Sequence, residues 1–369
     1  RKGEQASPWA KPFASHATYD VSKMDQWQIV FDHMMKKGLM AHIVFSESTN
    51  QSFFEVHEAS GDPNFSDKRK IYFREIVARF GYLNAVTWNI GEENGWDRRN
   101  LEWTGEEARG LTTQQQLDFT KYVDDLAYYD DFITVHNGHA STTRIYDNLQ
   151  GDNSITGTSL QGVLNNNERA TQSVKQYRNE SAQSGKKWVI YYDEAFSYEA
   201  FPEDASRFRR NILWSTLVSG GAGMEHFVTR ITNELGVEIY LDNILEDLRY
   251  SEEPFQLMKH AYDFYIDNNI PFYNMYNQDE IVDEGTCHGD DFQNYVIYRE
   301  KWGAQQRPNT TVDLVGDYEV KWYNPRTGGA LLDGTVTTLS TGQDLDLGEP
   351  PTELIEDWVI YLKSTITGP

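Results

Sequence analysis

Residues 188–196 read WVIYYDEAF, the strongest strand pattern in the chain, and this run ends in two acids followed by a small residue. A continuous apolar run of this kind is typical of a strand buried on both faces of a sheet. Five shorter runs share the pattern, at 39–45, 83–89, 132–136, 156–162 and 223–228. Helical patterns alternate with them, at 22–37, 66–80, 113–129, 167–183, 205–218 and 254–267. This alternation predicts an α/β fold with a parallel sheet. We expect Ser22 to cap the first helix and Gly38 to end it.

The predicted strands carry polar residues where they end. These residues are Glu47, Asn89, His136, Glu194 and Glu225. Polar side chains at the carboxyl ends of parallel strands are typical of a (β/α)8 TIM barrel. A doubly wound sheet binds ligands at the same edge and stays open as the alternative. The sequence predicts six strands, whereas a (β/α)8 barrel has eight, and we assign the six to barrel strands three to eight. We therefore expect that the first two βα units are missing, and that an N-terminal segment or a partner chain completes the barrel.

The pattern changes after Pro271. Short strands with period-two alternation follow, and turn signals such as Asn324-Pro325 separate them. These strands read YVIYRE, TVDLVG, YEVKWYN and WVIYLK. We therefore predict two domains, a catalytic (β/α) barrel over 1–270 and an antiparallel β-sandwich over 271–369. The short connection between them predicts that the sandwich packs firmly on the barrel.

The composition argues against several classes of protein. A formal net charge of −24 argues against nucleic-acid binding, because phosphate contacts need a basic surface. The single cysteine, Cys287, allows no disulfide within the chain. No run approaches the roughly 20 apolar residues of a membrane helix. No signal peptide is visible in the first residues, as in a mature protein, and we expect a secreted or periplasmic location.

Two acidic segments follow predicted strands and carry the candidate chemistry. WNIGEEN places Glu92 and Glu93 within one turn of a strand end. YYDEAF places Asp193 and Glu194 at another strand end, where neighbouring side chains point to opposite faces. Cleavage of a glycosidic bond needs two carboxyl groups on rigid elements that flank the bond. The alternatives are that Glu92 and Glu93 are solvated loop acids, and that Glu194 caps a helix or pairs with a neighbouring strand.

Other residues near these strand ends are candidates for substrate binding. They are Glu47, Trp88, Asn89, Glu92, His136, His139, Tyr192 and His226. The amide of Asn89 could orient a sugar hydroxyl, and Tyr191 or Tyr192 could donate a hydrogen bond to an ionised nucleophile and lower its pKa. His136 and His139 could instead bind a metal, but a His-x-x-His loop with no nearby third ligand is a weak metal signal. We therefore predict no metal site.

At this point the residues suggest a family. The sequence resembles the clan A glycoside hydrolases, and within them bacterial polysaccharide-degrading proteins with an apiosidase-like barrel and a C-terminal β-sandwich of collagen-binding type. The resemblance covers most of the chain and rests on KMDQWQIVFDHMMKKGLMAHIVFSE, WNIGEEN, WVIYYDEAF and KWYNPRTGG. In that clan the acid/base follows the fourth strand and the nucleophile follows the seventh. The resemblance therefore implies that Glu93 is the acid/base and Glu194 the nucleophile. The clan often has Asn directly before its acid/base, whereas Asn89 lies four positions earlier here, so Glu92 stays an alternative.

The leading hypothesis is a glycoside hydrolase that cleaves a plant or algal polysaccharide, or its oligosaccharides, by a retaining two-carboxylate mechanism. It predicts that the two carboxyl groups lie about 5 to 5.5 Å apart. The alternative is a non-catalytic carbohydrate-binding or extracellular matrix protein with a degenerate barrel. A third hypothesis is a polysaccharide lyase with His136 or a tyrosine as base, although no basic cluster that would neutralise a uronate is evident. Each hypothesis implies a carbohydrate partner, with no cofactor, nucleic acid or membrane.

Overall fold

The computed structural model of the chain describes residues 8–11, 15–46, 65–92, 111–138, 142–161, 170–193, 202–225, 230–232, 238–240, 252–301 and 310–366. The chain divides into two compact units. Unit 1 comprises Arg1–Gln161 and Glu180–Val189, and unit 2 comprises Gly162–Asn179 and Ile190–Pro369. The predicted domain boundary at residue 270 lies inside unit 2 and stays a prediction.

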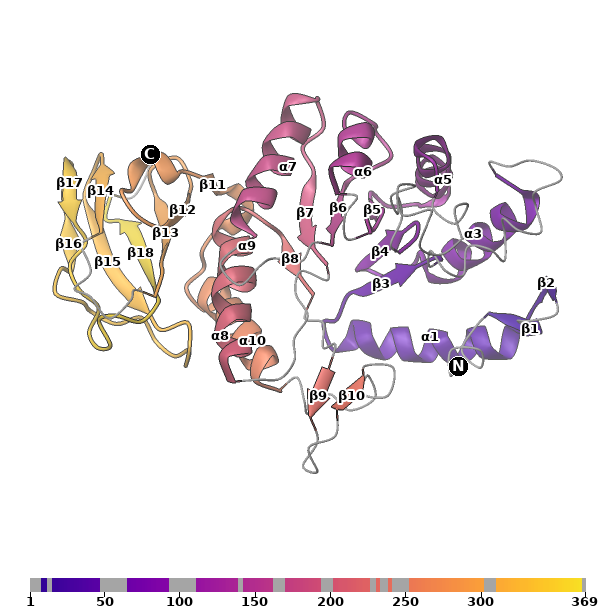
Figure 1. Cartoon of the computed structure of the whole chain (residues 1–369), viewed down its shortest axis with the longest axis horizontal. Coiled ribbons are helices and arrows are strands. Elements are labelled where there is room, and N and C mark those ends of the chain that lie inside the picture. The colour runs from indigo at the N-terminus through magenta and orange to yellow at the C-terminus, as the bar shows by residue number, and fades with distance from the viewer. Residues whose placement is uncertain are drawn as a thin grey trace. The chain divides into compact units, whose positions relative to one another are not determined.

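Unit 1 begins with a short hairpin and a long helix (Figure 1). β1 (Trp9–Lys11) and β2 (Ser15–Tyr19) pair antiparallel, and α1 (Val21–Lys36) follows. The cap of α1 is Asp20, whose carboxylate accepts a hydrogen bond from the backbone N–H of Lys23 at 3.3 Å. The predicted cap at Ser22 is therefore wrong, because Ser22 already lies in the first turn. Gly38 has a φ of +74° just after the helix, as predicted for the glycine that ends it.

A parallel sheet forms the centre of unit 1. β3 (Ala41–Val44), β4 (Val86–Asn89) and β5 (Phe132–Thr134) pair in that order, and both pairings are parallel. β6 (Gly157–Leu160) follows β5, because a parallel bridge joins His136 to Ser159 just beyond the end of β5. These strands confirm four of the six predicted from apolar runs.

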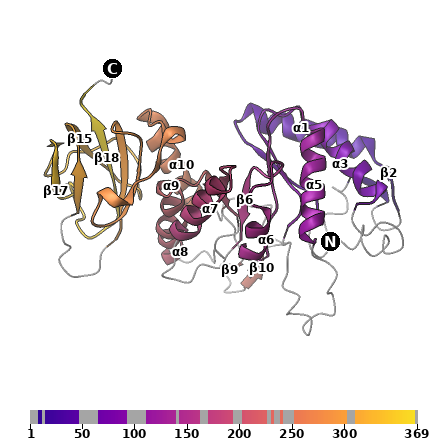
Figure 2. The same cartoon turned by 90° about the horizontal axis from the view of Figure 1, so that it is seen from above.

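Three helices of unit 1 connect these strands. They are α3 (Asp67–Phe80), α5 (Thr113–Leu126) and α6 (Thr142–Leu149). α3 and α5 were both predicted, and they lie side by side in both views (Figures 1 and 2). Ser66 caps α3, and Thr112 forms a capping box with Gln115 at the start of α5. α6 was not predicted, because eight residues are too few to display a helical period.

Unit 2 contains the other two predicted parallel strands. β7 (Val189–Tyr192), whose first residue belongs to unit 1, pairs in parallel with β8 (Gly223–Met224). α7 (Thr171–Gln183) precedes β7 and crosses the boundary between the units. The described residues therefore contain the six predicted parallel strands, and the eight strands of a complete barrel stay a prediction.

Helices and one antiparallel strand pair lie between β7 and the C-terminal sheets. The predicted helix over 205–218 is a run of α8 (Pro202–Arg207), the π-helix η3 (Phe208–Trp214) and α9 (Ser215–Val218). An antiparallel pair, β9 (Arg230–Thr232) and β10 (Glu238–Tyr240), follows β8. α10 (Glu252–Asp267) then matches the last predicted helix. Two short 3-10 turns, η6 (Phe272–Asn274) and η7 (Asp279–Ile281), lead into the C-terminal part.

The C-terminal part of unit 2 is antiparallel, as predicted. Its larger sheet has the order β11 (Tyr276–Asn277), β12 (Thr286–Gly289), β13 (Asn294–Arg299), β18 (Trp358–Ser364), β15 (Tyr318–Tyr323) and β16 (Thr338–Leu339). A second sheet pairs β14 (Thr311–Leu314) with β17 (Gly342–Asp346). The two sheets share one apolar core, in which Trp322 and Trp358 are the largest side chains. This shared core makes the two sheets a sandwich.

The larger sheet is also covered on its other face, by helices of unit 2. Neighbouring side chains along a strand point to opposite faces, so Ile297 enters the sandwich core while Tyr298 faces the helices. Tyr298 stacks on Trp214 of η3, with ring centroids 5.9 Å apart and planes 7° apart. The hydroxyl of Tyr323 donates to the carbonyl of His260 in α10 at 2.6 Å. The sandwich therefore packs on the helices of unit 2 that precede it, and its predicted packing on a barrel stays a prediction.

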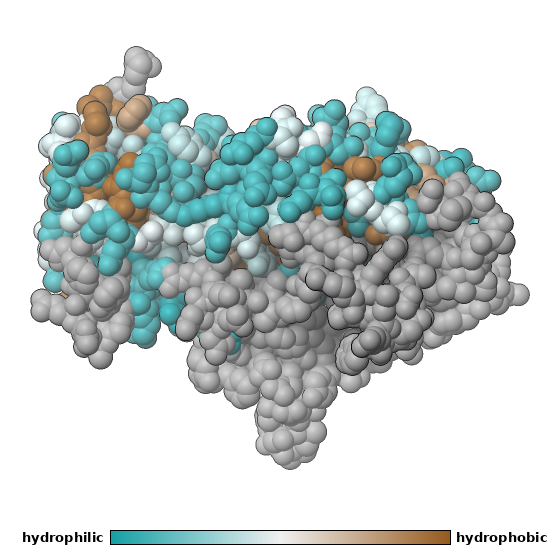
Figure 3. Space-filling model, turned by 45° about the horizontal axis from the view of Figure 1, so that its top comes forward, coloured by the Kyte–Doolittle hydropathy of each residue, from teal (hydrophilic) through white to brown (hydrophobic). Residues whose placement is uncertain are grey.

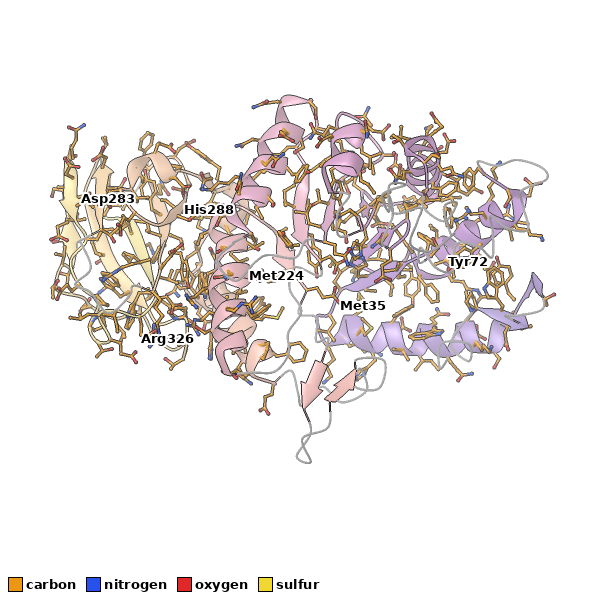
Figure 4. All side chains as sticks on the ribbon, viewed as in Figure 1. Met35, Tyr72, Met224, Asp283, His288 and Arg326 are labelled. Carbon is orange, nitrogen blue, oxygen red and sulfur yellow. The ribbon has the colours of Figure 1, made fainter. Side chains whose placement is uncertain are left out.

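A buried ion pair joins the sandwich to η3. The carboxylate of Asp357 is 0 % exposed and accepts from Arg209 Nε at 2.9 Å and Nη2 at 2.7 Å, and from the Tyr298 hydroxyl at 2.7 Å. Arg326 (Figure 4) donates to the backbone carbonyl of Asp357. Burial raises the pKa of Asp357, but the hydrogen bonds and charge of Arg209 outweigh burial and hold this pKa below its ordinary value.

The described surface is mainly hydrophilic on the face that Figure 3 presents. This fits a sequence in which 57 acidic residues outnumber 33 basic ones. None of the described helices combines the length and the apolar character that a bilayer span requires.

Candidate active site

The ends of β3, β4 and β5 meet at one buried amide. Asn89, the last residue of β4, is 0 % exposed. Its Oδ1 accepts from the backbone N–H of Gly91 at 3.1 Å and from that of His136 at 3.2 Å. Its Nδ2 lies 3.1 Å from Nε2 of His42 in β3. Because these partners belong to three neighbouring strands and the turns that follow them, the side chain of Asn89 fixes how the strand ends sit against one another.

The turn after β4 ends at Glu92, the alternative acid/base, and hydrogen bonds hold it on both sides. The N–H of Ile90 donates to the carbonyl of Thr134 in β5 at 2.9 Å. The N–H of Glu92 donates to the carbonyl of Ser46, just past β3, at 2.8 Å. Glu92 is half-buried at the end of this held segment. Glu93 comes next in the chain and lies outside the described residues.

The sheet of unit 1 has two unlike faces. The register places three apolar side chains next to one another on one face, those of Ile43, Trp88 and Ile133. The opposite face is mixed: it carries the polar residues His42, Thr87, Asn89 and Thr134 together with Val44 and Phe132. At the end of β4 this face presents Asn89, three residues before Glu92.

Trp88 lies in the core on the apolar face. Its indole is 0 % exposed and stacks on Phe45 with centroids 5.6 Å apart, while its N–H donates to Asp131 at 2.9 Å. Phe45 packs in turn on Phe73 of α3 at 4.5 Å, and the hydroxyl of Tyr72 in α3 (Figure 4) donates to the carbonyl of Phe45. The structure thus gives Trp88 a packing role, and its predicted contact with substrate stays a prediction.

Asn137 and Tyr146 tie the end of β5 to that of β6, and sequence reasoning missed both. The side chain of Asn137 donates to the carbonyl of Gln161 and accepts from its N–H, each at 2.8 Å, which extends the pairing beyond the strands. The Tyr146 hydroxyl lies 2.6 Å from the carbonyl of Val135 and 2.7 Å from that of Ser159. Asn137 stands beside His136 in VHNGH and was open to notice, whereas Tyr146 lies on the unpredicted helix α6.

The ends of β7 and β8 carry a tyrosine among carboxylates. Tyr191 stands opposite Gly223, and a Cβ added to Gly223 would lie 3.0 Å from the Tyr191 ring, so only glycine leaves that ring room. Burial raises the pKa of Tyr191, and the charges of Asp193 and Glu225 raise it further. Tyr192 faces the other way and is buried opposite Met224 (Figure 4). Tyr191 therefore shares a face with Asp193 and Glu225. The predicted role of Tyr192 beside Glu194, which lies outside the described residues, stays a prediction.

Several predicted site residues lie outside the described residues. They are Glu47, Glu93, His139, Glu194 and His226. Of the others, Asn89, Glu92 and His136 gather around the turn after β4, while Tyr192 lies in unit 2. Asn89 and His136 are both buried, and their predicted contacts with substrate stay predictions. Over the described ranges, His, Cys, Asp and Glu side chains form no group of three that could hold a metal ion.

The comparisons with known proteins point to one fold. No protein-family model matches the chain, and no curated protein matches its sequence. The chain is similar to a solved structure described as a putative glycoside hydrolase from Bacteroides vulgatus, with a TM-score of 0.58 and 12% identity over 95% of this chain and 64% of that one. The chain thus spans about two thirds of the length of that protein.

Two further solved structures are similar at TM-scores too low to support an argument. Xylanase B from Clostridium stercorarium F9 matches at a TM-score of 0.39 and 10% identity, over 60% of this chain and 76% of that one. Endo-glycoceramidase II from Rhodococcus sp. matches at a TM-score of 0.42 and 12% identity, over 97% and 87%.

The structural neighbours are glycoside hydrolases. At 12% identity, the likeness to the Bacteroides vulgatus protein establishes a shared fold. That shared fold agrees with the parallel α/β arrangement predicted from the apolar runs. The finer features predicted from resemblance, an apiosidase-like barrel and a collagen-binding-type sandwich, stay predictions.

Proposed function

We propose that the chain is a retaining glycoside hydrolase that acts on a plant or algal polysaccharide or its oligosaccharides. The observation that carries this proposal is the held turn after β4, in which hydrogen bonds from both neighbouring strand ends fix a glutamate-bearing segment. A two-carboxylate mechanism needs such rigidity, because the acid must stay within reach of one glycosidic oxygen. The fold shared with a glycoside hydrolase supports the same reaction class.

In the proposed mechanism Glu93 protonates the glycosidic oxygen while Glu194 attacks the anomeric carbon and forms a glycosyl-enzyme. Glu93 then removes a proton from the water that releases the sugar, so the configuration is retained. Glu92 is the alternative acid/base. The phenol of Tyr191 is protonated at neutral pH, as that of an ordinary tyrosine is, and it lies near enough to Asp193 and Glu225 for their charges to raise its pKa, so we propose that it donates a hydrogen bond to a carboxylate of the site.

Substrate binding is proposed for the polar residues of the turns after the strands. Glu47, His139 and His226 follow or lie within the predicted strand runs in the sequence. We propose that the buried residues Trp88, Asn89, His136 and Tyr192 serve the site by holding the strand ends. No cofactor is needed for this chemistry, because both proton transfer and nucleophilic attack come from carboxyl groups.

The test is hydrolysis of a panel of defined oligosaccharides and aryl glycosides by single variants. Glu194→Ala should abolish turnover, and either Glu93→Gln or Glu92→Gln should reduce it about 100-fold or more, which identifies the acid/base. Glu253→Gln, an exposed acid on α10, is the matched control and should leave turnover unchanged. Undiminished hydrolysis by Glu194→Ala would remove this residue from the mechanism.

The anomeric configuration of the first product distinguishes the retaining from the inverting reaction. Proton NMR of fresh product should give the anomer of the substrate, and the opposite anomer would require a wider carboxyl separation, about 6.5 to 9.5 Å. Saturable binding of a polysaccharide without any turnover would support the non-catalytic alternative instead.

We also propose that two further βα units complete the sheet beside β3. Apolar side chains in and just before this strand are exposed, namely those of Leu39, Met40 and Val44. A sheet edge with exposed apolar neighbours is typically covered by another element. A secreted or periplasmic location stays part of the proposal. A solved structure of the whole natural polypeptide with no strand beside β3 would contradict the completing units.

A further inference from the structure

The amide of Asn89 can be oriented in one way. Its Oδ1 faces the N–H groups of Gly91 and His136, and both of these groups can only donate. The N–H of His136 is shared with the carbonyl of Gly91 at 3.1 Å, whereas that of Gly91 goes to Asn89. The atom that faces these donors must therefore be the oxygen, and the Nδ2 group of Asn89 must face His42.

This orientation of the Asn89 amide determines the charge and the tautomer of the His42 imidazole. Nδ2 of Asn89 carries only hydrogens, so Nε2 of His42 at 3.1 Å must accept. His42 is therefore neutral, with its proton on Nδ1. A phenyl ring in place of His42 would keep a similar shape but would offer no acceptor. The Nδ2 group of the buried Asn89 would then be a buried hydrogen-bond donor without a partner on that side.

Asn89 lies only a few residues before Glu92 and Glu93 in the sequence. The backbone N–H of Gly91 donates a hydrogen bond to the side chain of Asn89, and Glu92 is the next residue. If Asn89 is shortened, Gly91 loses the acceptor that closes the turn, and the glutamates beyond it move with the turn. The turn would still be attached to β3 through the N–H of Glu92, so the expected effect is misplacement rather than unfolding.

We propose that Asn89, with His42 as its acceptor, is a positioning residue for the acid/base glutamate of the turn after β4. This inference rests on the proposed function. It assigns Asn89 to the geometry of proton donation and not to contact with the sugar, in keeping with its complete burial.

A misplaced acid has a signature that a merely destabilised fold lacks. An acid that protonates the leaving oxygen matters most when the leaving group is a poor one, because a dinitrophenolate departs without a proton. The readout is therefore the ratio of kcat/KM for a dinitrophenyl glycoside to kcat/KM for the matching phenyl glycoside. The sugar is the one that the wild type cleaves among glucosides, galactosides, xylosides and arabinofuranosides.

In Asn89→Ala, kcat/KM should fall about 100-fold on the phenyl glycoside and less than about 10-fold on the dinitrophenyl glycoside. His42→Phe, which changes a half-buried side chain at lower risk to folding, should shift the ratio in the same direction by a smaller factor. The control is Thr87→Ala. Thr87 is fully buried on the same face of the sheet, and its hydroxyl donates to the sulfur of Met40 rather than to the turn after β4. It should lower the melting temperature and leave the ratio unchanged.

An equal loss on both substrates in Asn89→Ala and His42→Phe overturns the inference, as does the same shifted ratio in Thr87→Ala. Wild-type protein that cleaves no member of the panel overturns the proposed function, and the inference with it. Wild-type activity with an unchanged ratio overturns the inference alone, so the two failures can be told apart.

Discussion

The substitution Asp357→Asn tests how the sandwich is held to the helices. It keeps the size of the side chain but removes the charge that pairs with Arg209, whose side chain is only 8% exposed. Loss of one partner from a buried ion pair costs about 3–5 kcal/mol of unfolding free energy, because the remaining charge stays buried. We expect the lower end, about 3 kcal/mol, since the new amide still offers an oxygen to Arg209 or Tyr298.

Urea denaturation followed by tryptophan fluorescence measures this loss, because Trp214 stacks on Tyr298 beside the ion pair. The matched control is Asp333→Asn, which breaks the exposed pair between Lys321 and Asp333 and should cost at most about 1 kcal/mol. A loss in Asp357→Asn no larger than that of the control would refute the reasoning. The double variant Arg209→Met with Asp357→Leu should recover part of the stability, because no buried charge of the pair is left unpaired although the Tyr298 hydroxyl loses its acceptor.

The difference in unfolding free energy between the wild type and Asp357→Asn should change with pH in a defined direction. The folded-state pKa of Asp357 is lowered, so its stabilising effect is complete above the unfolded value, about 4. That effect is lost as the pH falls through the lower folded value. The gap between wild type and Asp357→Asn should therefore shrink below about pH 4. A gap that widens with acidification would contradict the assignment.

Two other substitutions probe the parallel part of unit 1. Gly157→Ala should destabilise the protein by about 3 kcal/mol or more and lower its melting temperature in circular dichroism, because the new methyl group would meet the carbonyl of Val189 and the ring of Phe132. A melting temperature equal to that of the wild type would exclude this close packing. Thr112→Ala should cost about 1 kcal/mol in chemical denaturation, because it removes the capping box of α5, and Thr112→Ser should restore most of it. Equal stability of the Ala and Ser variants would argue against the cap.

The strands were predictable because their apolar runs are a local signal. All six parallel strands lie within the predicted runs, and each observed strand is shorter than its run. The runs overestimate length because apolar residues beyond either end of a strand, such as Phe45 and Leu83, are also buried. Four of the C-terminal strands, β13, β14, β15 and β18, were predicted in the same way, since period-two alternation marks both faces of β15. β11, β12, β16 and β17 were not predicted.

The roles of single residues at the strand ends were harder to predict. Sequence cannot tell which face of a strand buried on both sides bears the polar groups, so Tyr191 and Tyr192 were both candidates, and the structure places Tyr191 on the face of Asp193 and Glu225. Trp88 and Asn89 follow a similar logic, because both stand next to the predicted acids but make their contacts within the protein. Apart from Gly91, the hydrogen-bond partners of Trp88 and Asn89 lie more than 40 positions away, as His42 and Asp131 do, and no local pattern encodes those contacts.

The account depends most on Glu194 as the nucleophile. Incubation with an activated 2-deoxy-2-fluoro glycoside slows release of the glycosyl-enzyme, and mass spectrometry of the digested protein then locates the bound sugar. The account predicts one sugar, attached to the peptide that contains Glu194. A sugar on another acid, or turnover of the substrate with no covalent intermediate and with an inverted product, would contradict it.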